Sequence, residues 1–93
     1  MKLILEPDEI AALAKALERW GEVSQVGQAI EECGELLAVL NQHYRGRATA
    51  DQVAEEVADV MINMAQLARM IGEERVQYYL DAKMRVLFAL LEQ

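Results

Sequence analysis

Hydrophobic side chains recur every three or four residues along most of this chain, which is the spacing of amphipathic helices. The first such run follows Pro7 and extends to about Trp20, where Gly21 interrupts the pattern. Three further runs cover about residues 24–44, 49–72 and 74–91, and no stretch is typical of a strand. The pattern therefore predicts an all-α fold with four helices, the first at about residues 7–20.

Short polar segments mark the boundaries of these helices. Ser24 is a suitable N-cap for the second helix, and Thr49 with Gln52 has the spacing of a capping box at the start of the third. Residues 45–48 form the loop between them, and the third helix ends near Gly72. Because the loops are short, we expect the helices from residue 24 onward to pack antiparallel in a single domain that covers residues 1–93.

The helix at 24–44 is apolar around most of its circumference, so it needs packing partners on several sides. Ile30, Leu37 and Leu40 cover one side of this helix, while Leu36 and Val39 lie on another. A chain of 93 residues offers too few other helices to cover both sides. We therefore expect a helical bundle shared between copies of the chain, in a homodimer or in a tetramer built as a dimer of dimers.

The composition limits which kinds of partner the protein can bind and which cellular compartment it fits. A net charge of −7 argues against nucleic acid as the partner, because phosphate backbones need a basic surface. No run reaches the roughly 18 apolar residues of a membrane-spanning helix, and the first residues are too few for a signal peptide. Cys33 is the only cysteine, which excludes an internal disulfide and fits a reducing cytosol. We expect a cytoplasmic protein that binds neither nucleic acid nor membrane.

Acidic residues are concentrated in two short clusters, at residues 31–35 and 55–59. Glu32 and Glu35 are three residues apart, and Glu56 and Asp59 repeat that spacing on the next helix, so each pair shares one face of its helix. If the two helices pack antiparallel, the four carboxylates converge and repel one another. A divalent cation relieves this repulsion, and Mg²⁺, with Mn²⁺ as a substitute, prefers such oxygen ligands.

Two interpretations of these acids remain open from geometry alone. Glu32 lies between Leu36 and Val39 in the apolar sector of its helix, where an unpaired glutamate is unusual. Glu56 and Asp59 instead lie on a polar face, which is also typical of solvated side chains. The clusters therefore fit either a metal site or ordinary solvated helix faces.

The chain resembles the MazG-like all-α nucleotide pyrophosphohydrolases in two motifs, Glu31-Glu32-Cys33-Gly34-Glu35-Leu36 and Glu55-Glu56-Val57-Ala58-Asp59-Val60. That family's pattern is E-x-x-E, a spacer of variable length, and then E-x-x-D. Here Glu32 and Glu35 match the first half of the pattern, and Glu56 and Asp59 match the second. The resemblance extends from about residue 20 to about residue 72.

The resemblance implies a Mg²⁺-dependent hydrolase. Such an enzyme cleaves a nucleoside triphosphate, (d)NTP, between the α- and β-phosphates and releases the monophosphate and pyrophosphate. It implies that the metal-binding and catalytic residues are Glu32, Glu35, Glu56 and Asp59. The chemistry suits such a site, because a carboxylate-held metal orients phosphates, neutralises developing charge and lowers the pKa of the attacking water.

The substrate-binding residues that the resemblance implies lie outside the four acids. Family members draw basic phosphate contacts from a K-x-x-R-like stretch in the final helix, where Lys83 matches the lysine and Arg85 is displaced by one position. Asn63 lies one turn beyond Asp59 on the same face, and Gln28 shortly precedes the first acidic pair. We expect Gln28, Asn63 and Lys83 to contact the substrate.

Two alternatives share the acidic motifs. A phosphoribosyl-ATP pyrophosphatase has a similar length, but such enzymes tend to have a lysine and a histidine where this chain has Gln28 and Asn63. The non-enzymatic alternative is a metal-binding helical assembly module, whose acids hold metal only for stability. Release of pyrophosphate from nucleoside triphosphates distinguishes an enzyme from the module.

Overall fold

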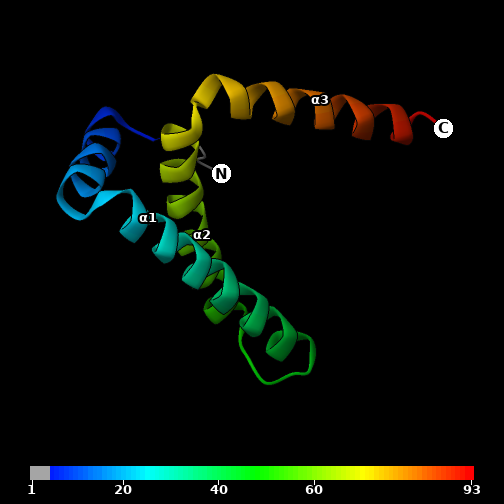
Figure 1. The fold of residues 1–93 in the computed structure, drawn as a ribbon. Helices are drawn as coiled ribbons and strands as arrows, with labels where there is room; N and C mark the ends of the chain where they lie inside the picture. The colour runs from blue at the N-terminus through cyan, green and yellow to red at the C-terminus, as the bar shows by residue number, and fades with distance from the viewer. Residues whose placement is uncertain (1–4) are drawn as a thin grey trace.

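The computed structural model describes residues 5–93, and within that range the chain is all-helical with no strand. Three helices follow one another in the sequence: α1 at Pro7–Tyr44, α2 at Ala50–Ile71 and α3 at Glu73–Leu91 (Figure 1). The all-α class predicted from the hydrophobic pattern is therefore confirmed.

A sharp kink at Gly21 divides α1 into two straight parts, residues 7–20 and 22–44 (Figure 1). Gly21 has φ 84° and ψ 164°, a region that essentially only glycine occupies. The interruption predicted at Gly21 is present, but the prediction of four separate helices is wrong. The helix resumes directly after Gly21 with no loop, so the first two predicted helices form one kinked element, and Ser24 lies inside α1 instead of capping a new helix.

The turn between α1 and α2 follows the predicted capping box. Gln52 N donates to Thr49 Oγ1 at 3.2 Å, and Thr49 N donates in return to Gln52 Oε1 at 2.8 Å. Before this cap, Gly46 adopts a positive φ of 74°, which allows the chain to reverse within residues 45–49. The tight turn makes α1 and α2 an antiparallel hairpin, as predicted.

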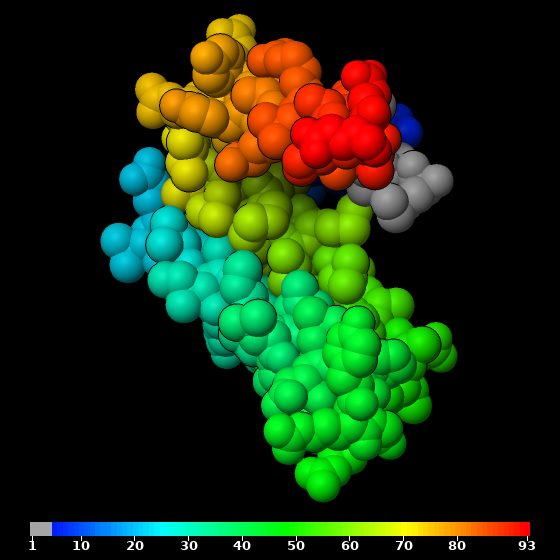
Figure 2. All heavy atoms as spheres, turned by 90° about the vertical axis from the view of Figure 1, so that its right-hand side faces the viewer, coloured from blue at the N-terminus to red at the C-terminus, as the bar shows by residue number. Residues whose placement is uncertain are grey.

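The hairpin is the main packing unit of the chain. The straight part of α1 at residues 22–44 lies along α2, whereas the backbone of α3 approaches α2 alone, close to their junction at Gly72. In Figure 1, α3 leaves the hairpin and extends away from it, and Figure 2 shows it across one end of the molecule, so the antiparallel packing predicted for this last helix is wrong. The shared bundle predicted from the sequence is not visible in a single chain and stays a prediction.

Very little of the described chain is buried. Only Ala29 and Gln66 are fully buried between residues 5 and 93. Gln66 is 3% exposed, and its Nε2 donates to the Leu13 carbonyl at 2.7 Å and to Gln25 Oε1 at 2.9 Å. This side chain on α2 therefore connects both straight parts of α1, on either side of the kink.

None of the helices described between residues 5 and 93 combines the length and the apolar character that crossing a bilayer requires.

The Gln66 contacts predict a large effect of a small substitution. Gln66→Ala removes the donor from two acceptors in a protected site, so we expect the free energy of unfolding to fall by about 1–3 kcal/mol. The matched control is Gln77→Ala, because Gln77 is exposed on α3 and donates to Asp81 Oδ1 at 2.7 Å. Chemical denaturation should show a change within about 0.5 kcal/mol for this control. Equal changes for the two variants would contradict the bridging role of Gln66.

Candidate metal centre

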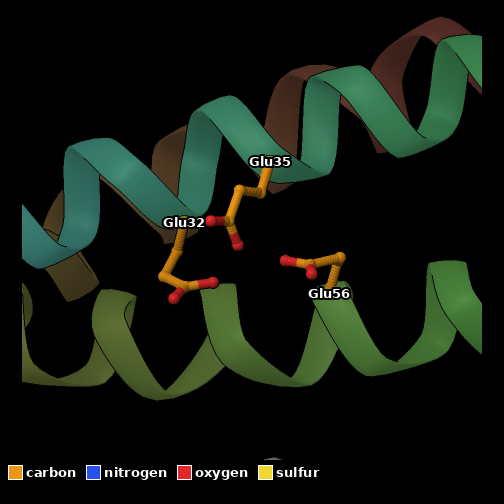
Figure 3. Close-up of side chains that lie close together, drawn as sticks. All are labelled: Glu32, Glu35 and Glu56. Atoms are coloured by element: carbon orange, nitrogen blue, oxygen red, sulfur yellow. The ribbon is translucent and has the colours of Figure 1, made fainter.

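The hairpin brings three carboxylates together across the contact between α1 and α2. Glu32 and Glu35 extend from α1, and Glu56 extends from α2. Figure 3 shows the three side chains directed into the space between the two helices. One carboxylate oxygen from each lies within 4.8 Å of the other two. We call Glu32, Glu35 and Glu56 the acidic triad.

Asp59, the fourth predicted ligand, lies outside this group of mutually close oxygens. It is half-buried one turn after Glu56 on α2. Its negative charge is near enough to raise the pKa of both Glu32 and Glu56. The structure therefore brings together three of the four predicted acids and places Asp59 beside them.

Two oxygens of the triad are buried without a hydrogen-bond partner, Glu32 Oε2 and Glu56 Oε2. Glu32 Oε1 in contrast accepts a hydrogen bond from Gln28 Nε2 at 3.0 Å. Protected polar atoms in native structures are usually paired, and either a bound cation or a proton shared between Glu32 and Glu56 would satisfy these two oxygens.

The negative charges of the site oppose one another. Burial is the largest cause that raises the pKa of Glu32, followed by the charges of Glu35 and Asp59, while the hydrogen bond from Gln28 lowers this pKa in part. Burial is also the largest cause that raises the pKa of Glu56, followed by the charges of Glu35, Glu32 and Asp59. The folded chain therefore holds protons on these two groups more tightly than a solvated glutamate does.

No basic side chain among residues 10–93 neutralises the triad. The ion pair found in this range joins Arg69 to Glu73, with its nitrogen and oxygen 3.7 Å apart. Converging carboxylates with unpaired oxygens are the donor set that a hard divalent cation prefers. The chemistry of these residues therefore fits Mg²⁺ or Mn²⁺, and a soft metal is disfavoured because the triad offers neither sulfur nor nitrogen.

The three predicted substrate-binding residues lie in different surroundings. Gln28 acts on the triad through its hydrogen bond to Glu32. Asn63 Nδ2 donates to the carbonyl of Asp59 at 2.8 Å, within its own helix. Lys83 is exposed on α3, which packs on α2 and extends away from the hairpin (Figure 1). One chain therefore does not bring Lys83 to the acids, and the three substrate contacts stay predictions.

Sequence reasoning missed that Gln66, on the same polar face of α2 as the predicted acids, is buried against α1. Asp59, Asn63 and Gln66 follow one another at helical spacing, and Gln66 reaches Gln25 of α1. The i, i+4 spacing of Gln28 and Glu32 was a signal for their hydrogen bond, since such pairs meet on a helix surface. For Gln66 the sequence held no signal, because burial of a polar face depends on tertiary packing.

Comparison with models of protein families, with curated proteins and with solved structures finds no match to this chain. The resemblance to MazG-like enzymes therefore rests on the two acidic motifs and the residues around them.

The raised pKa values of Glu32 and Glu56 predict a dependence of stability on pH. A raised pKa in the folded state means that the folded protein binds more protons than the unfolded chain, so this contribution to stability falls as pH rises above the ordinary value of 4.5. Without metal, Glu32→Gln should therefore gain stability relative to the wild type as the pH rises toward neutrality.

Thermal melts of both proteins across this pH range measure the difference. Glu55→Gln is the matched control, because Glu55 is exposed and belongs to the same cluster in the sequence. A constant difference between wild type and Glu32→Gln at all pH values would show that the triad is not under electrostatic strain.

Proposed function

We propose that this protein is a Mg²⁺-dependent nucleoside triphosphate pyrophosphohydrolase, which cleaves a (d)NTP to the monophosphate and pyrophosphate. The observation that carries the proposal is the acidic triad, with buried oxygens of Glu32 and Glu56 that lack hydrogen-bond partners. The resemblance of the two acidic motifs to the MazG-like pattern supports the reaction class.

The residues of the site have separate tasks in this proposal. Glu32, Glu35 and Glu56 would hold the cation, which when bound orients the phosphates, offsets their charge and lowers the pKa of the attacking water. Gln28 orients Glu32 through the hydrogen bond to Oε1. Glu35 is exposed whereas Glu32 and Glu56 are half-buried, so the triad opens to solvent beside Glu35. Asp59 adds negative charge that strengthens attraction for a cation.

Self-association is part of the same proposal. The chain would act as a homodimer or as a dimer of dimers in the cytoplasm, as its apolar composition predicts. Lys83 and the triad lie apart in one chain, so a contact between Lys83 and the phosphates would come from α3 of a neighbouring copy. The net charge of −7 favours this small-molecule substrate over nucleic acid.

Conservative substitutions in the acidic site test the catalytic role. Glu35→Gln and Asp59→Asn each remove a charge with almost no change in volume, so the helical fold should persist. We expect the rate of pyrophosphate release from a panel of (d)NTPs with Mg²⁺ to fall by at least about 100-fold in each variant. Removal of a single group that stabilises the charge of a transition state typically has an effect of this size.

Glu31→Gln and Glu55→Gln are the matched controls, since both residues are exposed neighbours of the acids in question. Their rates should stay within a few-fold of wild type. Activity of Glu35→Gln near that of Glu31→Gln would rule out the assigned role of the triad. Hydrolysis of phosphoribosyl-ATP alone would favour the alternative pyrophosphatase.

Metal binding to the folded state should also raise the stability of the protein. A ligand that binds only the folded state stabilises it by about 2.7 kcal/mol at one hundred times its dissociation constant. We expect the melting temperature of the wild type to rise with Mg²⁺ concentration, and that of Glu32→Gln to start higher and respond less.

A sodium salt at equal ionic strength is the control for screening of the acids. An identical rise with sodium and with Mg²⁺ would contradict a specific cation site. A specific rise with Mg²⁺ in a protein that hydrolyses no triphosphate would favour the metal-binding assembly module.

A further inference from the structure

The straight part of α1 carries an apolar stripe with the repeat of a coiled coil. Four residues are separated by seven positions each: Val23, Ile30, Leu37 and Tyr44. Between them lie Val26, Cys33 and Leu40, so the intervals alternate between three and four residues. This is the pattern of core positions in helices that pair along their full length. We call these seven residues the α1 seam.

Five of the seven residues of the α1 seam are exposed, whereas Cys33 and Leu40 are half-buried. Val23 and Tyr44 are each 88% exposed, and Ile30 and Leu37 are 69% and 71% exposed. Two shallow hollows follow one another along the seam, and Ile30 lines both of them. The second hollow is completed by Met64 and Leu67 of α2. An apolar stripe of this length on a helix surface is unusual in a monomeric protein.

Two glycines beside the seam have no explanation within one chain. Gly27 and Gly34 are seven residues apart inside α1, and each lies next to the seam on the helix surface. Neither has a positive φ, and an added Cβ at either position would meet no atom within 4 Å. Glycine disfavours helix relative to alanine, and small residues at such positions let another helix backbone come close.

The exposed surface of the chain exceeds that of a compact monomer. The accessible area is 7515 Å², whereas a folded monomer of 10.5 kDa exposes about 5,400 Å². The excess of about 2,100 Å² per chain corresponds to about 4,200 Å² buried between two copies, which is within the range of obligate homodimers. The amount of surface to be covered therefore fits a second copy of the same chain.

We propose that the α1 seam is the axis of self-association, along which α1 of a second copy packs with its own seam. In a dimer with two-fold symmetry, the same surface of each copy contacts its equivalent on the other. The α1 seam of one copy would therefore pack against the α1 seam of the second. Pairing over the full seam places its midpoint, at Cys33 and Gly34, next to the two-fold axis. The glycines then allow the two helix backbones to approach closely.

This inference rests on the proposed self-association and adds the surface that carries it. It makes no use of the acidic triad, which lies between α1 and α2. The oligomeric state and the effect of substitutions along α1 therefore test it separately from hydrolysis.

Sedimentation of the full chain over a range of micromolar concentrations is the experiment. The wild type should have at least twice the 10.5 kDa mass of one chain. Ile30→Lys and Leu37→Lys should raise the dissociation constant at least about 30-fold, as for a residue at the centre of an interface. Gln42→Lys is the matched control, because Gln42 is exposed and lies about 100° or more around α1 from every seam residue.

Gly34→Ala is the more discriminating variant. A free helix surface and a contact between two copies predict changes of opposite sign in the melting temperature. On a free helix surface with open space, alanine should raise the melting temperature and leave association unchanged. At a close contact between two copies of α1, it should weaken association about 10-fold or more and lower the melting temperature. A wild-type monomer would overturn the self-association together with the seam. A wild-type oligomer that is unaffected by Gly34→Ala and Ile30→Lys would overturn the seam alone.

Discussion

Repulsion between carboxylates that face one another across the α1–α2 contact is the constraint on which the rest of the structure depends. Glu32 and Glu56 are half-buried with one unpaired oxygen each, and Glu35 adds a third carboxylate within 4.8 Å. Hydrophobic packing between the same helices must hold these charges in place. Clusters of charged side chains that destabilise the folded state are common at functional sites, because selection for stability alone would favour apolar side chains at these positions.

The described residues give the hairpin little hydrophobic packing of its own with which to hold this arrangement. Within the described residues, full burial is limited to Ala29 and Gln66, so a single chain gains little from hydrophobic burial. A second copy packed along the α1 seam would add such packing, because it would cover the exposed side of α1 that borders Met64 and Leu67 of α2. In this view the cation and the second copy stabilise the same hairpin from two sides.

The sequence was most informative where one local rule decides the structure. The capping box at Thr49 and the interruption at Gly21 depend on neighbouring residues, and both were predictable. Convergence of the triad followed from two repeats of one spacing on antiparallel helices. The helix count was wrong because the sequence cannot tell a glycine kink from a loop. The burial of Gln66 and the separation of Lys83 from the acids depend on how whole helices pack, which periodicity does not determine.

The most direct test of the triad as a cation site is anomalous X-ray diffraction from crystals of the protein grown with Mn²⁺. A single strong anomalous peak per chain should lie among Glu32, Glu35 and Glu56, with carboxylate oxygens from both α1 and α2 as ligands. Movement of Asp59 into the coordination sphere would fit the same assignment. An empty triad in crystals whose only Mn²⁺ peaks lie on exposed acids elsewhere would contradict it.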